Sequence, residues 1–231
     1  MIQSYQTNFF CKKQLNQNTF LFTFKLINPP TIDFIPGQYL ILQVNGKPRL
    51  YSIASSSEEK GKLEFIIKIF PNGMASSYLE KIKPGDKVVF QGPIGQFVLK
   101  ENDKKKVFLI TGAGIAPVRS MLRDEKIRKE DIFLFWGLKK YADTYLTEEF
   151  KVYNFKICLS REESLETVPI DERKFFNLGY VGTALEKNID FQSNPENYEF
   201  YLCGSREIVE SLKQSLLEKG VLPGSIISEK F

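Results

Sequence analysis

The stretch 107–117, VFLITGAGIAP, decides the fold of the second half of this chain. Its first four residues are all apolar, as in a strand that is buried on both faces. The turn Thr111–Pro117 that follows is poor in side chains, and a helical pattern begins at Val118. Backbone N–H groups in such a turn approach a phosphate closely, and the start of a helix favours an anion. Strand, turn and helix in this order therefore favour a phosphate-binding loop over a plain tight turn, which gives the same Gly-x-Gly pattern.

The chain after about residue 105 repeats this alternation of strand and helix. The predicted buried strands, each mostly apolar, are 107–110, 132–136, 155–159 and 198–202. The predicted helices are 118–129, 145–152 and 206–219, the last with one apolar face. Such alternation indicates a parallel α/β sheet, in which ligands bind beyond the carboxyl ends of the strands.

Residues 1 to about 100 have a different period. Side chains of 20–26 and of 63–69 alternate with a period of two, which is typical of half-buried strands. Gly and Pro pairs such as Pro36-Gly37 mark turns between strands, and only 76–82 has a short helical pattern. Many short strands separated by turns predict a small closed β-barrel or a sandwich.

Composition excludes several kinds of chemistry. The 231 residues contain no histidine, which excludes Ser–His and Cys–His nucleophiles and any His-based zinc site. Three cysteines are too few for the four thiolates of a plant-type iron–sulfur cluster, so no metal site is predicted. The net charge of +4 is too small to indicate nucleic-acid binding. We expect no membrane span, no export signal and a cytoplasmic location, because no apolar run approaches roughly 18 residues and the cysteines form no disulfide framework.

Three shorter motifs add candidate binding residues. In Arg49-Leu50-Tyr51-Ser52 the guanidinium suits a pyrophosphate, the phenol ring suits a flat heterocycle, and the hydroxyl suits a ring nitrogen. The small residues from Gly73 to Ser76 precede a possible helix and form a second seat for an anion. Cys203 follows the last long strand, where a helix start is expected to lower the pKa of a thiol. Each motif alone is also compatible with a purely structural role: a surface arginine, an N-capped loop or a buried structural cysteine.

Taken together and in this order, the motifs resemble those of the ferredoxin–NADP reductase family. The resemblance covers nearly the whole chain. It implies a Greek-key antiparallel β-barrel that binds FAD at 1–100, followed by a Rossmann-like parallel α/β domain that binds NAD(P) at 101–231. It also implies that Arg49 binds the flavin diphosphate, that Tyr51 stacks on the isoalloxazine and that Ser52 lies near flavin N5. The residues implied to cradle the FAD pyrophosphate are Gly73, Met74, Ala75 and Ser76.

The same resemblance assigns residues to the nicotinamide nucleotide. The loop matches the family's G-x-G-x-x-P pattern, and Cys203-Gly204 matches its C-G element near the nicotinamide. Glu229 and the terminal Phe231 are similar to an acid–x–aromatic ending whose last ring covers the flavin. The residues implied on this side are Thr111, Gly112, Gly114, Pro117, Cys203, Gly204, Glu229 and Phe231.

The choice between NADH and NADPH stays open at this point. Ser160-Arg161 resembles the pair that grips the 2′-phosphate in NADPH-dependent members, and no acid follows the second predicted strand at Trp136-Gly137. Glu162 and Glu163 interrupt the rest of that pattern. The resemblance therefore leans toward NADPH.

The resemblance implies an NAD(P)H-dependent flavin oxidoreductase. Ser52, Cys203 and Glu229 are implied to orient the reacting rings, and Phe231 to gate them. Residues 112–122 are similar to the reductase components of bacterial oxygenases such as phenol hydroxylase, without their iron–sulfur domain. The expected acceptor is therefore a separate molecule: a ferredoxin, a flavodoxin or an oxygenase component. Two alternatives remain, namely a reductase that uses free flavin as substrate and a non-catalytic flavin- or nucleotide-binding subunit.

Overall fold

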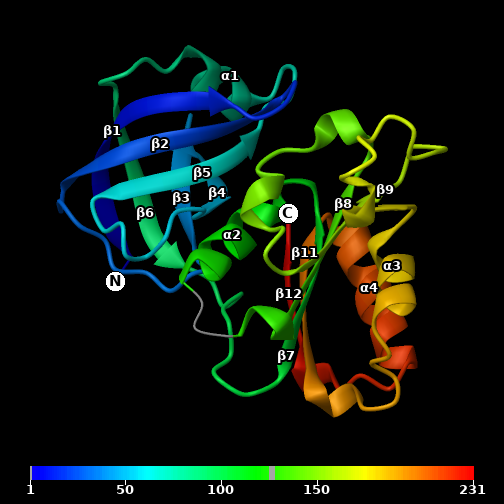
Figure 1. Ribbon diagram of the computed structural model, residues 1–231. Helices are drawn as coiled ribbons and strands as arrows, with labels where there is room; N and C mark the ends of the chain where they lie inside the picture. The colour runs from blue at the N-terminus through cyan, green and yellow to red at the C-terminus, as the bar shows by residue number, and fades with distance from the viewer. Residues whose placement is uncertain (1, 125–127) are drawn as a thin grey trace. The chain divides into compact units, whose positions relative to one another are not determined.

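The computed structural model describes residues 2–124 and 128–231 (Figure 1). Contacts divide them into two compact units. Unit 1 comprises residues 2–100 and 116–124, and unit 2 comprises 101–115 and 128–231. The segment 116–124, which the sequence-based division places in the second domain, is thus grouped with the first.

Unit 1 is built on a six-stranded antiparallel sheet in the order β4-β3-β6-β1-β2-β5. Beyond the end of β4, the Ala54 N–H donates to the Glu64 carbonyl of β5 at 2.8 Å, which draws the two edge strands together. The sheet forms a half-barrel, in line with the antiparallel β-barrel domain that the resemblance implies. Its elements are β1 (Gln3–Gln14), β2 (Thr19–Asn28), β3 (Tyr39–Val44), β4 (Lys47–Ser52), β5 (Lys62–Lys68), α1 (Met74–Lys81) and β6 (Lys87–Ile94).

Aromatic rings fill the concave side of this half-barrel. Phe22 and Phe24 are fully buried, as the period of two in β2 predicts. The Phe65 and Phe90 rings stack with centroids 5.0 Å apart, and Phe24 meets Phe90 edge-on at 5.1 Å. Such pairs contribute about 0.5–1.5 kcal/mol each beyond the area they bury. The alternation seen in the sequence thus places the core of unit 1 correctly.

Unit 2 contains a six-stranded parallel sheet in the order β10-β9-β8-β7-β11-β12. This confirms the predicted fold class, an antiparallel β domain followed by a parallel α/β domain. The strands are β7 (Lys105–Thr111), β8 (Ile132–Leu138), β9 (Asn154–Leu159), β10 (Phe176–Leu178), β11 (Tyr198–Gly204) and β12 (Ile226–Lys230), and the helices are α3 (Val181–Asn188) and α4 (Arg206–Glu218). No helix among the described residues is long and apolar enough to cross a membrane.

Two predicted helices differ from the structure. The helix expected at 118–129 is α2 (Ile115–Asp124); Arg128 is already extended, and 125–127 lie outside the described residues. The helix expected at 145–152 was wrong, because left-handed Leu146 separates two short 3₁₀ turns, Tyr141–Asp143 and Thr147–Glu149. The Trp136 ring explains the apolar pattern there, since it packs edge-on against Tyr145 and Phe150 with centroids 4.8 and 6.0 Å away.

A buried ion pair joins β7 to β11 near their amino ends. Lys106 Nζ lies 2.7 Å from Glu199 Oε2, and both side chains are almost fully buried. Asn102 and Tyr201 also donate to the Glu199 carboxylate. Burial alone would raise the pKa of Glu199, but the hydrogen bonds from Lys106 and Asn102 outweigh it and hold the pKa below its ordinary value.

Glu199→Gln should lower the free energy of unfolding by about 3–5 kcal/mol, because it leaves the Lys106 ammonium buried without a counter-charge. The folded-state pKa of Glu199 is depressed, so the carboxylate stabilises the fold above its ordinary pKa of 4.5 and stops doing so as the pH falls through the folded value. Chemical denaturation at several pH values measures both effects. Equal stability of variant and wild type at neutral pH would contradict this role.

Candidate functional site

Arg49 and Tyr51 lie on the edge strand β4. They pair with Leu42 and Leu40 of β3, and alternate residues of a strand share a face. The Tyr51 ring is half-buried against Phe65, with centroids 6.2 Å apart. Burial raises the pKa of Tyr51 to about 12, although the Arg49 charge acts in the opposite direction, so the phenol stays neutral at physiological pH. The Arg49 guanidinium donates to the Pro48 carbonyl at 2.8 Å.

The predicted anion seat lies at the start of α1. Gly73 is the N-cap of this helix, with an extended backbone, and no acidic residue occupies the first turn. The Ser76 hydroxyl accepts a hydrogen bond from the Phe70 N–H at 2.9 Å. A Cβ at Gly73 would come within 2.9 Å of Ser76 Oγ, so the close packing here requires glycine. Small side chains and an uncompensated helix start suit a phosphate group.

Most of the predicted nucleotide-binding residues of unit 2 lie at the carboxyl ends of β7, β11 and β12. The parallel register pairs Cys203 with Ile110 on one side and with Glu229 on the other. The Phe231 N–H donates to the Gly204 carbonyl at 3.2 Å. Strand β12, which the sequence pattern did not predict, thus brings Glu229 and Phe231 to the edge where the glycine loop, Thr111–Gly114, begins.

Close backbone packing holds the glycine loop in place. A Cβ at Gly114 would come within 2.6 Å of the Cys203 carbonyl oxygen, and a Cβ at Gly204 would overlap Thr111 Oγ1. Gly112 has a φ of +53°, which favours glycine. The indole N–H of Trp136 donates to the Gly112 carbonyl at 2.9 Å. Sequence reasoning missed this role of Trp136, although its place at the end of the second strand of the parallel sheet signals it.

The expected lowering of the Cys203 pKa was wrong. Cys203 lies inside β11 and is 1% exposed, whereas α4 begins at Arg206. Burial raises the pKa of this thiol well above its ordinary value, and the adjacent Glu229 carboxylate raises it further. Cys203 is therefore a neutral thiol packed against the glycine loop.

Ser160 and Arg161 follow β9, and both form hydrogen bonds with the backbone at the end of β8. The Ser160 N–H and hydroxyl both donate to the Leu138 carbonyl, at 3.0 and 3.2 Å, and the Arg161 N–H donates to that of Lys139 at 2.9 Å. Arg161 is exposed. Glu162 turns back to accept from the Tyr141 N–H at 3.0 Å. Pro117 is buried in the first turn of α2, where a missing N–H costs little.

Comparison with known families accounts for both halves of this arrangement. The oxidoreductase FAD-binding domain matches residues 7–99, and the oxidoreductase NAD-binding domain matches residues 108–214. The chain belongs to the ferredoxin reductase-like family of FAD- and NAD(P)-binding oxidoreductases. The FAD-binding match contains Arg49, Tyr51, Ser52 and the start of α1, and the NAD-binding match contains the glycine loop, Ser160-Arg161 and Cys203-Gly204. Glu229 and Phe231 lie beyond both matches.

Relatives of this family include electron transfer components of dioxygenases. The chain is 32% identical over 226 residues to the toluate 1,2-dioxygenase electron transfer component of Pseudomonas putida, covering 95% of this chain and 65% of the relative. It is 29% identical over 212 residues to the anthranilate 1,2-dioxygenase electron transfer component of Acinetobacter baylyi, covering 87% and 59%. The chain thus spans about three fifths of the length of these relatives.

Solved structures share the fold. A ferredoxin NADP⁺ reductase from Neisseria gonorrhoeae with bound FAD and NADP aligns with a TM-score of 0.82 at 23% identity, covering 98% of both chains. An Amycolatopsis cytochrome P450 reductase aligns with a TM-score of 0.83 at 24% identity, covering 100% of this chain and 70% of the other. These likenesses extend the family match to the three-dimensional fold.

Gly114→Ala should lower the free energy of unfolding by about 1–3 kcal/mol, because the new methyl group pushes the loop away from the Cys203 carbonyl. It should also weaken NADP⁺ and NAD⁺ binding, measured by calorimetry, since the loop N–H groups shift. Gly224→Ala is the control, because a Cβ there meets no atom within 4 Å. Unchanged nucleotide affinity in Gly114→Ala would show that the loop does not hold the nucleotide.

Proposed function

We propose that this protein is a flavoenzyme that takes hydride from NAD(P)H onto bound FAD and passes electrons to a separate acceptor, such as a ferredoxin, a flavodoxin or an oxygenase component. One observation carries the proposal: a single chain contains both nucleotide-binding domains of the family. The flavin-side candidates all lie in unit 1, and most of the nicotinamide-side candidates gather at one edge of the sheet of unit 2. We assign FAD binding to residues 1–100 and NAD(P) binding to 101–231.

The residues of unit 1 fit an FAD molecule. The start of α1 offers N–H groups among small side chains, with Gly73 required by its approach to Ser76. Arg49 supplies a guanidinium for the diphosphate, and charge-assisted hydrogen bonds of this kind contribute about 1.5–3 kcal/mol each. The neutral Tyr51 ring, fixed against Phe65, offers a flat apolar surface to the isoalloxazine. When bound, the flavin supplies the redox chemistry by accepting a hydride and releasing electrons singly or in pairs.

Residues at and just beyond the carboxyl ends of β7, β11 and β12 orient the nicotinamide nucleotide in this proposal. The glycine loop and the first turn of α2, from Thr111 to Pro117, hold the pyrophosphate, and Trp136 fixes the loop through the Gly112 carbonyl. Glu229 lies beside Cys203 in the register of β12, so its carboxylate and the neutral thiol border the same edge of the sheet. Phe231 is 66% exposed and is free to cover a planar ring.

Ser160 and Arg161 favour NADPH as the cosubstrate. The exposed guanidinium and the hydroxyl follow β9, at the carboxyl edge of the sheet where nucleotides bind in this class of fold. Glu162, the nearest acid in sequence, is engaged by the Tyr141 N–H and points toward the β8 loop. A 2′-phosphate would therefore meet Arg161 as a counter-charge.

The proposed acceptors rest on the relatives. Both dioxygenase relatives are named electron transfer components, and this chain matches about three fifths of each. A separate protein that receives electrons from the reduced flavin is therefore the acceptor that these likenesses support best.

Anaerobic titration of the FAD-loaded protein with NADH and then with NADPH tests the proposal. We expect the visible flavin band to bleach, faster with NADPH. A colourless protein that reduces only added free flavin would make it a flavin reductase. A flavin band that neither nucleotide bleaches would make it a binding module and refute the proposal.

Ser52→Ala should slow flavin reduction about tenfold, which corresponds to about 1.4 kcal/mol lost from a hydrogen bond to the reacting ring. The dissociation constant for FAD should change little, because Arg49 and α1 supply the phosphate contacts. Stopped-flow reduction and a fluorescence titration measure the two quantities. Equal reduction rates in Ser52→Ala and wild type would remove Ser52 from the site.

A further inference from the structure

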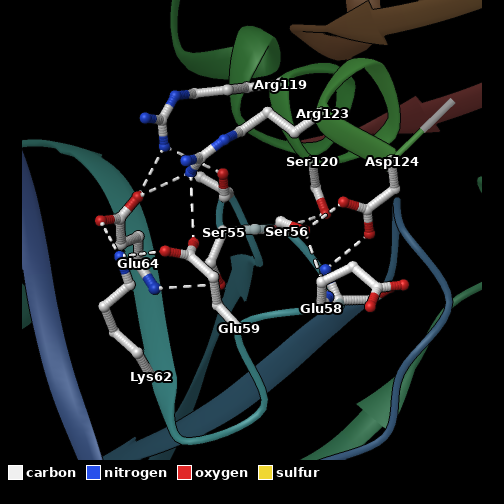
Figure 2. Close-up of polar contacts among 12 residues, drawn as sticks. Ser55, Ser56, Glu58, Glu59, Lys62, Glu64, Arg119, Ser120, Arg123 and Asp124 are labelled. Carbon is white, nitrogen blue, oxygen red and sulfur yellow. Dashed lines mark hydrogen bonds and ion pairs between the residues drawn. The ribbon is translucent and has the colours of Figure 1, made fainter.

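Helix α2, which follows the glycine loop, is hydrogen-bonded to residues 54–57, which follow the flavin motif Arg49–Ser52 (Figure 2). Helix α2 begins at Ile115, directly after Gly112–Gly114, and residues 53–56 directly follow Ser52. One guanidinium nitrogen of Arg119, Nη1, donates both to the Ala54 carbonyl at 3.0 Å and to Glu64 Oε2 at 2.8 Å. The two predicted binding motifs therefore continue into segments that a single arginine holds together.

The ion pair between Arg119 and Glu64 is buried. The Arg119 and Glu64 side chains are 6% and 11% exposed. Lys62 also reaches Glu64, with Nζ at 3.0 Å from Oε1, and Arg123 lies 3.3 Å from Oε2. Burial by itself would raise the pKa of Glu64, but the hydrogen bonds from Arg119 and Lys62 outweigh it, so the carboxyl is ionised at neutral pH. A charged, buried acid thus contacts three cations, of which Arg119 is buried and Lys62 and Arg123 are partly exposed.

Hydrogen bonds of three serines also join residues 55–57 to helix α2. The Ser120 hydroxyl donates to the Ser55 carbonyl at 2.7 Å, and both residues are fully buried. At the end of the helix Asp124 accepts from the Ser56 hydroxyl and from the Ser57 N–H. The Ser55 hydroxyl in turn accepts from the Glu64 N–H at 3.2 Å. Residues 54–57 are therefore bonded to Arg119, Ser120 and Asp124 of the helix.

We infer that Glu64 and Arg119 are positioning residues for the flavin reaction: their buried pair fixes residues 54–56 to α2 and so sets the place of Ser52 and of the first turn of α2. The inference rests on the proposed function. It assigns a role to residues that lie outside Arg49–Ser52 and Thr111–Pro117.

Geometry, rather than stability, is the contribution that this buried ion pair makes in the proposal. Replacing a buried ion pair with apolar residues of similar size often leaves the free energy of unfolding unchanged or raises it. A charged and directional contact, in contrast, holds its partners in a single geometry. The guanidinium bonds a carbonyl only two residues beyond Ser52. A shift there moves the Ser52 hydroxyl, and reaction rates respond steeply to displacements of about 1 Å.

Glu64→Gln tests the inference, because it keeps the size of the side chain and removes its charge. At saturating FAD and NAD(P)H we expect the limiting rate of flavin reduction to fall at least about tenfold. The visible circular dichroism of the bound flavin, which reports how the ring is held, should change as well. Arg119→Lys should fall between wild type and Arg119→Met, since an ammonium keeps the charge and loses the planar fork.

Glu199→Gln is the matched control. It removes one charge from another buried pair, in unit 2, and should lower stability without changing the flavin dichroism or the limiting rate. Glu59→Gln removes a half-exposed acid that also contacts Arg123 and should change neither. If Glu64→Gln does not fold, Arg119→Lys and Ser120→Ala carry the same measurements.

Loss of stability in Glu64→Gln with wild-type dichroism and rate would overturn the inference and leave a purely structural pair. Failure of the proposed function gives a different result, because wild-type protein would then resist reduction by both nucleotides. In that case the flavin dichroism of Glu64→Gln and wild type still decides whether the pair positions the ring.

Discussion

Close packing around two glycines at the carboxyl ends of β7 and β11 is the constraint on which the nucleotide half of the protein depends. Gly114 lies against the Cys203 carbonyl, and Gly204 lies against Thr111, at distances that leave no room for a Cβ. The two strands are neighbours in the parallel sheet, so this contact fixes where the glycine loop turns from strand to helix. Cys203 and Glu229 then take their places from the register of the strands. A neutral thiol results, because the same packing that positions Cys203 also excludes water from it.

In each unit a buried ion pair joins segments that are far apart in sequence. Lys106 and Glu199 are 93 residues apart and connect neighbouring strands of unit 2, whereas Arg119 and Glu64 are 55 residues apart and connect α2 to the half-barrel. The first pair lies near the amino ends of its strands, away from the edge that carries the candidate site. In the second pair Arg119 also bonds the Ala54 carbonyl, two residues after Ser52, and Arg119 itself follows Gly114 by five residues. Their different places explain why we assign the first to stability and the second to positioning.

The sequence predicts the fold class and most strands because period and turn residues are local properties. The apolar runs 107–110, 132–136 and 198–202 became β7, β8 and β11, and the helical pattern at 206–219 became α4. The apolar pattern of 145–152 wrongly predicted a helix. Tyr145 and Phe150 both pack against the ring of Trp136 rather than forming one face of a helix. Strand β12 and the Arg119–Glu64 pair are decided by tertiary contacts between distant segments, which no local pattern records. For the same reason the proximity of Cys203 to a helix start gave the wrong direction for its pKa.

The central claim is that this chain moves a hydride from a nicotinamide to its own flavin. The most direct test is anaerobic stopped-flow reduction of the FAD-loaded protein with NADPH and NADH that carry deuterium at the transferred position of nicotinamide C4. The account predicts a flavin reduction rate that saturates with nucleotide concentration and a primary isotope effect on its limiting value. Bleaching without an isotope effect at any nucleotide concentration, or no bleaching at all, would contradict it.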